Sequence, residues 1–346
     1  MVVESTAANP KGLQEVLAIV KDELKGEFPI EEFVSKGIPS ILIRNTTEST
    51  RNFKIILNAH LDVVPGKEGD FTPKEKDGKL YGRGAYDMKA AAAVMVYLFK
   101  DLAKTVSYPI ALQLVTDEEV GGFHGVSHQI DEGVRGEFVI SGECGSNLRI
   151  IHKAKGIVWL KLHARGVTAH SAYLWRGSNA LVKLHKALAI LHELFPHPES
   201  AQWVTTMNLA KIETSNTTFN HVPDDARAFL DIRFTEGTKE TMVEKIKNAL
   251  PDDIDIEVLL GSAPHTVSPD NTQIMALTKA IEQVTQKKAQ LGGSHAQSDL
   301  RHFTSVGCPG VEFGIAGEHQ HGDEEWVNIK SLEDYYTILK TYLLTA

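Results

Sequence analysis

Asn58-Ala59-His60-Leu61-Asp62-Val63-Val64 follows the apolar run 53–57, which predicts a buried strand. In an extended chain His60 and Asp62 point to the same side, because side chains alternate with period two. An imidazole and a carboxylate at this spacing are a common metal-ligand pair, in which one binds and the other orients. A second stretch, Tyr81-Gly82-Arg83-Gly84-Ala85-Tyr86-Asp87-Met88-Lys89, opens an apolar helix. Asp87 therefore stands at a loop-to-helix junction, where a carboxylate can meet a cation.

Length and composition limit the class of protein. The 346 residues suffice for two domains, and 42% hydrophobic with 23% charged residues is ordinary for a globular protein. No apolar run reaches the roughly 18 residues of a membrane helix, and the N-terminus lacks a signal pattern. Two cysteines indicate no disulfide framework, so we expect a cytoplasmic protein. The net charge of -9, without a basic run, argues against nucleic acid as a partner.

Three predicted strands deliver acids or histidine at their carboxyl ends. The strand 53–64 carries His60, the strand 109–116 leads into Asp117-Glu118-Glu119, and the strand 138–141 leads into Gly142-Glu143. Strands that alternate with helices predict an α/β sheet, which places ligands outside the carboxyl ends of its strands. The stretch 70–80 is polar and predicts a loop. The helices expected around these strands span residues 11–25, 88–104, 271–286 and 331–344.

The sequence texture changes from about Lys155. The expected order there is β-α-β-β-α-β, the split arrangement of a ferredoxin-like domain. Its strands span residues 157–164, 203–212, 226–234 and 254–260, and its helices span 178–195 and 239–250. We therefore predict an α/β domain with a mixed sheet, formed by residues 1–154 and 263–346, interrupted by an inserted α+β domain at 155–262.

The candidate residues share oxygen and imidazole donors and lack thiolate. They are His60, Asp62, Asp87, Glu118, Glu119, Glu143 and His321. Such donors suit zinc, cobalt or manganese, and two histidines with three acids exceed what one tetrahedral ion takes. The set fits two ions about 3.5–4 Å apart that share a bridging carboxylate. The neighbours Glu118 and Glu119 repel each other unless a cation neutralises one or one stays protonated, so one can ligate while the other moves a proton. No Walker loop or Gly-x-Ser-x-Gly elbow is present, so a phosphate cradle or a serine hydrolase has no support.

Nine short motifs resemble the dinuclear zinc family of aminoacylases, acetylornithine deacetylases and succinyl-diaminopimelate desuccinylases, which also contains glutamate carboxypeptidases and dipeptidases. The motifs span nearly the whole chain in the family's order. They are His60–Pro65, Gly82–Lys89, Thr116–Gly122, Gly142-Glu143, Gly166–Ala172, Asn220–Pro223, Leu230–Arg233, Ser298-Asp299 and His321–Val327. The resemblance implies a zinc-peptidase-like catalytic domain and an inserted lid and dimerisation domain.

The resemblance also implies roles for the candidates. His60 and Glu143 would bind one zinc, Glu119 and His321 the other, and Asp87 would bridge both, with a peptide bond after it that is often cis in the family. Cobalt or manganese could substitute. The carboxylate of Asp62 would hold the His60 imidazole. Glu118 would be the general base, taking a proton from a water whose pKa the zinc ions lower and passing it to the leaving amine.

Further implied residues lie mainly in the inserted domain. In the family, the histidine at the position of His170 reaches the active site of the partner subunit of a homodimer and stabilises the oxyanion. Asn220 and Arg233 resemble the family's substrate-carboxylate contacts, and we add Tyr173 and Ser298 as candidate substrate contacts.

Several alternatives stay open at this stage. Either His319 or His321 could ligate, and the spacing to Glu325-Trp326-Val327 favours His321. Glu143 is typical of the deacylase-like members, whereas Trp175–Ala180 is more similar to the peptidase-type members. We expect a hydrolase of an N-acyl amino acid, of deacetylase or desuccinylase type. The alternatives are a carboxypeptidase or dipeptidase of short peptides, and a non-catalytic metal-binding relative.

Overall fold

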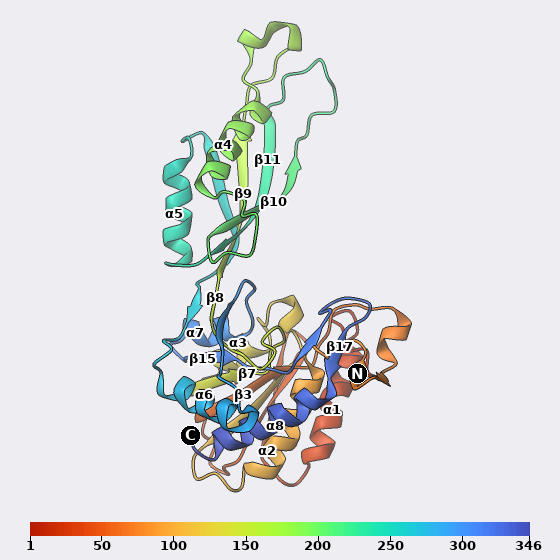
Figure 1. Cartoon of the computed structure of the whole chain (residues 1–346). Coiled ribbons are helices and arrows are strands. Elements are labelled where there is room, and N and C mark those ends of the chain that lie inside the picture. Colours follow the sequence, from red (N-terminus) through yellow and green to blue (C-terminus); the bar gives the residue numbers. More distant parts are fainter. The chain divides into compact units, whose positions relative to one another are not determined.

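A computed structural model describes all residues, 1–346, and the chain divides into two compact units (Figure 1). The first unit comprises Met1–Lys153, Thr266–Ser294 and Ser298–Ala346, and the second comprises Ala154–His265 with His295–Gln297. None of the helices combines the length and the apolar character that a bilayer crossing requires.

A mixed sheet forms the centre of the first unit. Its order is β1-β2-β6-β3-β7-β15-β8-β13, with β14 paired to β8. β3 runs parallel to both β6 and β7, and β15 runs parallel to β7, whereas the pairs β1/β2, β2/β6 and β15/β8 are antiparallel. The strands span β1 Ile30–Ser35, β2 Ile38–Arg44, β3 Asn52–His60, β6 Ile110–Val115, β7 Arg135–Ser141, β8 Ile150–Ala154, β13 His265–Thr266, β14 Leu291–Ser294 and β15 Gly310–Glu312. Because β3, β6 and β7 are parallel, their carboxyl ends share one edge, as the sequence predicts.

Helices cover both faces of this sheet. One face packs against α1 (Pro10–Leu24), α2 (Lys89–Leu102), α6 (Thr272–Thr285) and α8 (Ile329–Leu343), and the other against α3 (Val126–Asp131) and α7 (Leu300–Ser305). α1 begins where the side chain of Asn9 accepts a hydrogen bond from the backbone N–H of Gly12, with Pro10 in the first turn. Side chains that alternate along β3 fill the two cores, Ile55 and Leu57 on one face and Ile56 on the other. The core therefore follows from the apolar runs that predicted the strands.

A chain of buried amides crosses the second of these faces. The side chain of Asn58 donates to Gln113 at 3.0 Å, and Gln113 donates to Gln129 at 3.0 Å. Gln129 then donates to the hydroxyl of Ser40 at 2.9 Å. These side chains are almost fully buried, and each amide finds a partner, as a low-dielectric interior demands.

A second, small sheet contradicts one prediction. The stretch 70–80, predicted as a loop, contains β4 (Lys74–Lys76) and β5 (Lys79–Tyr81), which form a sheet with β17 (Trp326–Asn328) and β16 (Gly317–Glu318). The missed signal is the turn Asp77-Gly78, whose residues have φ of 52° and 71°. An Asp-Gly pair with positive φ at both residues is the preferred turn of a two-residue hairpin.

The strand that carries His60 is shorter than predicted. β3 ends at His60, so Asp62 lies beyond the strand rather than within it. The chain stays anchored there, because the backbone N–H of Leu61 donates to Val115 at 2.8 Å and that of Val63 donates to Ser5 at 3.0 Å. The prediction that this strand extends to residue 64 is wrong. Apolar residues continue along the chain after His60, although the hydrogen-bonded ladder of β3 ends there.

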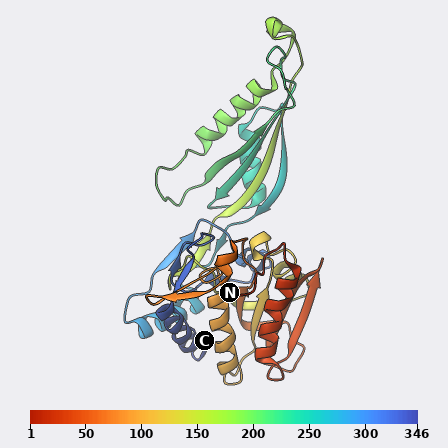
Figure 2. The ribbon, with the colours of Figure 1, turned by 90° about the vertical axis from the view of Figure 1, so that its right-hand side faces the viewer.

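The second unit has the predicted β-α-β-β-α-β order (Figure 2). Its antiparallel sheet has the order β10-β11-β9-β12, and both helices contact β9 and β12 and each other, so they cover one face. The elements are β9 Gly156–Arg165, α4 Ala180–Leu194, β10 Thr206–Glu213, β11 Asp225–Phe234, α5 Lys239–Ala249 and β12 Ile254–Ser262. Buried and half-exposed residues alternate along β11, as expected for a sheet with one covered face.

Candidate metal centre

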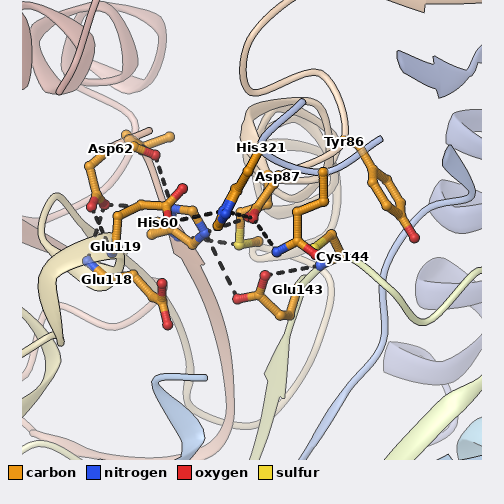
Figure 3. A network of polar contacts seen from close by, with 12 residues as sticks. His60, Asp62, Tyr86, Asp87, Glu118, Glu119, Glu143, Cys144 and His321 are labelled. Atoms are coloured by element: carbon orange, nitrogen blue, oxygen red, sulfur yellow. Dashed lines mark hydrogen bonds and ion pairs between the residues drawn. The ribbon is translucent and has the colours of Figure 1, made fainter. Parts of the chain in front are cut away.

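Loops at the carboxyl edge of the first unit's sheet bring five donor residues together (Figure 3). His60 is the last residue of β3, and Glu119 lies in the short helix η2 (Glu118–Val120) that follows β6. Glu143 follows β7, Asp87 precedes α2, and His321 comes from the loop between β16 and β17. The parallel strands thus place three of the five, and two loops place the others.

The five donors form two groups that share one aspartate. In the first group, His60 Nε2 lies 2.9 Å from Asp87 Oδ1 and 3.8 Å from Glu143 Oε2. In the second group, His321 Nε2 lies 3.1 Å from Asp87 Oδ2 and 3.1 Å from Glu119 Oε2. The ligand atoms of each group lie within 4.8 Å of one another. Asp87 offers one oxygen to each group, so its geometry suits a bridging carboxylate.

The chemistry of the donor set fits divalent cations. Asp87, Glu119 and Glu143 form ion pairs only with the two histidines, and Glu119 Oε1 is buried without a hydrogen-bond partner. Three carboxylates packed together repel each other unless positive charge neutralises them. Carboxylate oxygens and imidazole nitrogens are ligands of zinc, and each group offers three of them. The residues therefore fit a pair of such ions.

The acids and histidines of the site shift one another's pKa values. Burial lowers the pKa of His60, but hydrogen bonds to Asp62 and Asp87 outweigh it and raise that pKa well above its usual range. Hydrogen bonds to Asp87 and Glu119 raise the pKa of His321 to about 10. Burial alone would raise the pKa of Asp87, yet the hydrogen bonds from His321 and His60 lower it far below its usual range. The anionic aspartate is thus the electrostatic centre of the cluster.

Glu118 differs from its neighbour Glu119 in its surroundings. Desolvation of its carboxyl group and the negative charge of Asp299 raise the pKa of Glu118 well above its usual range. Glu118 belongs to neither donor group, although it precedes Glu119 on η2. A carboxyl group with a raised pKa beside a metal centre suits proton transfer near neutral pH.

The carboxylate of Asp62 fixes the backbone of the two glutamates. Its Oδ1 accepts from the N–H of Glu118 at 3.2 Å, and its Oδ2 accepts from the N–H of Glu119 at 3.0 Å. His60 Nδ1 lies 3.0 Å from the backbone carbonyl of Asp62 and 3.5 Å from Oδ1. The closest partner of the imidazole is therefore the carbonyl, and the carboxylate couples this loop to η2.

The structure distinguishes between the two histidines of the last motif. His321 faces Asp87 and Glu119, whereas His319 belongs to neither donor group. The side chain of Gln320 between them donates to Asp87 Oδ2 at 2.7 Å. Both histidines have positive φ, 63° and 60°, a conformation that residues other than glycine rarely adopt.

Sequence reasoning missed several buried polar groups around the site. Glu325 lies inside a recognised motif and Arg83 inside another, but their pairing across the chain could not be seen. Burial raises the pKa of Asp299 to about 7 and that of Glu312 to about 7. Ser298, a candidate substrate contact, is buried and donates to Glu312 at 2.7 Å. The peptide bond between Asp87 and Met88 is cis, as the resemblance implies.

Four predicted contacts lie in the second unit. His170 precedes the short helix η3 (Ser171–Arg176), forms a β-bridge with His221, and its ring centroid lies 5.8 Å from that of Tyr173. The carbonyl of Asn220 accepts from the N–H of Ser171 at 3.0 Å. His170, Tyr173 and Asn220 therefore gather in one pair of loops before β11.

Arg233 lies at the other end of β11. Asp225 begins that strand, so the strand rise of about 3.3 Å per residue separates Arg233 from the loops by about 25 Å. Its guanidinium binds Asp231 through Nε at 2.7 Å and Nη2 at 3.0 Å. Within this unit, the structure does not bring Arg233 together with His170. The roles of all these residues, like those of the donor groups, stay predictions.

The family model for peptidase family M20/M25/M40 matches residues 56–345. This match covers both units, so the chain belongs to that family and is a metal-dependent hydrolase.

Curated relatives agree with this assignment, and solved structures agree with the fold. The chain is 29% identical to a succinyl-diaminopimelate desuccinylase of Erythrobacter litoralis over 345 residues, covering 94% of this chain and 86% of the relative. It is also 29% identical to the Rickettsia felis desuccinylase, over 82% of this chain and 81% of that one. Among solved structures, a tripeptidase of Staphylococcus aureus superposes with a TM-score of 0.80 at 18% identity, covering 99% of this chain and 95% of that one. Aminopeptidase PepT of Bacillus cereus gives 0.76 at 20% identity, covering 99% and 93%. The solved structures support the fold alone.

Proposed function

We propose that this member of the family hydrolyses the amide bond of an N-acyl amino acid, with an N-succinyl diamino acid as the first candidate substrate. The observation that carries the proposal is the pair of donor groups sharing Asp87 beside Glu118. The similarity to two desuccinylases over most of the chain supports the choice of acyl group.

We assign each residue of the site a distinct role in hydrolysis. His60 and Glu143 would hold one zinc ion, Glu119 and His321 would hold the other, and Asp87 would contribute one oxygen to each; cobalt or manganese could substitute. Bound ions would act as a Lewis acid: they would polarise the amide carbonyl and lower the pKa of the attacking water. Glu118 takes the proton from that water and delivers it to the amine nitrogen as the C–N bond breaks. Asp62 keeps the backbone of Glu118 and Glu119 in place while the proton moves.

We assign the second unit to substrate binding and to dimerisation. His170 stabilises the oxyanion in the site of the partner subunit of a homodimer. Asn220 contacts the substrate carboxylate beside it, with Tyr173 as a further substrate contact, and Arg233 contacts the carboxylate from the other end of β11. The separation of about 25 Å along β11 supports this division, because one small substrate cannot touch both ends of the strand. Ser298 would contact substrate only if it releases Glu312. We place the enzyme in the cytoplasm.

The alternative is a carboxypeptidase or dipeptidase, which the residues Trp175–Ala180 favour. A hydrolysis panel separates the two functions: succinyl-diaminopimelate and acetylornithine against dipeptides, each tested before and after chelation. Faster release of amino acid from the dipeptides would replace the proposal with the alternative.

The variant Glu118→Ala tests the mechanism. Loss of a general base lowers turnover by about 10²-fold or more, and we expect this fall without loss of bound metal. The matched control is Glu132→Gln. It removes a carboxylate that belongs to neither donor group and whose Oε2 lies 3.3 Å from Arg51 Nη1. A folded, metal-loaded Glu118→Ala protein with wild-type turnover would refute the assignment of the base. Metal content without hydrolysis of any amide in the panel would instead favour a non-catalytic relative.

A further inference from the structure

A buried ion pair lies behind the donor groups. Arg83 follows β5 and Glu325 precedes β17, and the two are 242 residues apart in sequence. Arg83 Nη1 lies 2.8 Å from Glu325 Oε2, and the residues are 3% and 2% exposed. The ladder between β5 and β17, in which Tyr81 pairs with Trp326, brings the two together.

Each member of the pair also holds the backbone of a donor residue. Glu325 Oε1 accepts from the N–H of Tyr86 at 2.8 Å and from the N–H of Asp87 at 3.0 Å. Arg83 Nη2 donates to the carbonyl of His321 at 3.2 Å. One ion pair thus connects the residue shared by both donor groups with a residue that belongs to only one of them.

Stability alone does not explain this arrangement. A buried ion pair is often replaceable by apolar side chains of similar volume without loss of stability, because desolvation offsets the attraction. The pair in this chain uses a guanidinium, whose several N–H groups can bind a carboxylate and a carbonyl at the same time. A lysine ammonium could keep the carboxylate but is too compact to span both acceptors.

We infer that Arg83 and Glu325 are positioning residues that set the spacing of the two donor groups. Glu325 acts on Asp87 and so on both metal sites, whereas the Arg83 contact that lysine cannot keep, the one to the His321 carbonyl, acts on the second site only. This inference rests on the proposed function, because it assumes that the donor groups bind metal. It predicts that the two side chains affect the two metal sites differently.

The variants Arg83→Lys and Glu325→Gln test this division. Removing a group that orients a metal ligand typically weakens metal binding by 10- to 100-fold. We expect Arg83→Lys to bind one zinc with wild-type affinity and the other about 10- to 100-fold more weakly. Glu325→Gln should weaken both. Zinc titration against a competing chelator, without substrate, gives the two dissociation constants, and thermal unfolding shows that each variant is folded.

The matched control is Glu31→Gln. Glu31 also pairs with arginines, Arg44 at 2.8 Å and Arg51 at 2.6 Å, but contacts no donor residue. We expect it to leave both zinc constants unchanged. Turnover of Arg83→Lys should return to within a few-fold of wild type at saturating zinc, because the defect lies in metal affinity.

The outcomes separate this inference from the proposed function. If the wild-type protein binds two zinc ions and a folded Arg83→Lys binds both equally well, the inference alone is overturned. The same holds if Arg83→Lys weakens both sites equally, or if Glu31→Gln weakens zinc binding as much. A wild-type protein that binds no zinc overturns the proposed function and this inference with it.

Discussion

The substitution Asp62→Asn tests how the carboxylate of Asp62 affects turnover independently of metal binding. Asp62 is fully buried, and its two oxygens accept the N–H groups of Glu118 and Glu119 at 3.2 and 3.0 Å. Asparagine keeps one acceptor oxygen and turns an NH₂ group toward the other N–H. One charge-assisted hydrogen bond is therefore lost and replaced by a contact between two donors.

The size of the effect follows from that single bond. A hydrogen bond to a charged group contributes about 1.5–3 kcal/mol. If this energy holds Glu118 in its reactive position, its loss raises the barrier by a similar amount. With a factor of ten for each 1.36 kcal/mol, turnover should fall about 10- to 150-fold.

The assay is steady-state hydrolysis of the best substrate from the panel, with zinc content measured on the same sample. Both ions must be present, so that a fall in turnover reports the position of the base. The control is Asn271→Ala, because the side chain of Asn271 also accepts two backbone N–H groups, those of Gln273 and Ile274, but at the start of α6. This control should lose about 1 kcal/mol of stability and keep its turnover. An Asp62→Asn protein with two zinc ions and turnover within threefold of wild type would refute the reasoning.

Three further predictions concern stability. Chelation of bound metal should lower the unfolding temperature of the first unit by about 10 °C. The reason is that free metal at about a thousand times its dissociation constant stabilises the folded state by about 4 kcal/mol. An unchanged temperature after chelation would mean that no metal was bound. Burial raises the pKa of Glu312 from 4.5 to about 7, so the native state keeps this proton after the unfolded state has lost it. In metal-free protein, the stability contributed by the neutral form is fully present below pH 4.5 and falls by about 3 kcal/mol as the pH rises to 7, and denaturant titrations of Glu312→Gln should lack this fall. Gln113→Leu should lower the free energy of unfolding by about 2–6 kcal/mol, since it leaves the buried NH₂ group of Asn58 without an acceptor and the side-chain oxygen of Gln129 without a donor, whereas Gln283→Leu on the exposed side of α6 should change it little.

The fold class and the family follow from the sequence because apolar runs and acidic strand ends are local signals. His60, Glu119 and Glu143 each stand near the end of an apolar run, and parallel strands then determine that they meet. The small sheet was missed because Lys74–Lys76 is exposed and short, so no alternation marks it.

The supporting residues could not be predicted in the same way. A charged residue in a sequence carries no sign of its burial, and Arg83 gains its partner only when residues 242 positions apart meet. The contact of Asp62 with the N–H groups of Glu118 and Glu119 depends on where β3 ends, which apolar content does not show. Residue types and short spacings thus indicate the chemistry, while the groups that orient it depend on long-range geometry.

The buried amide chain from Asn58 to Ser40 has a consequence for folding errors. Asn58 pairs directly with Gln113 across β3 and β6, and His60 lies two residues further along the same side of β3. A slip of β3 by one position would turn both side chains to the opposite face and leave the buried side-chain oxygen of Gln113 without its donor. A chain that collapses with β3 in the wrong register is thereby destabilised even without bound metal. The amide chain thus favours the native register of β3. In that register His60 lies at the carboxyl edge of the sheet, beside the other donor residues.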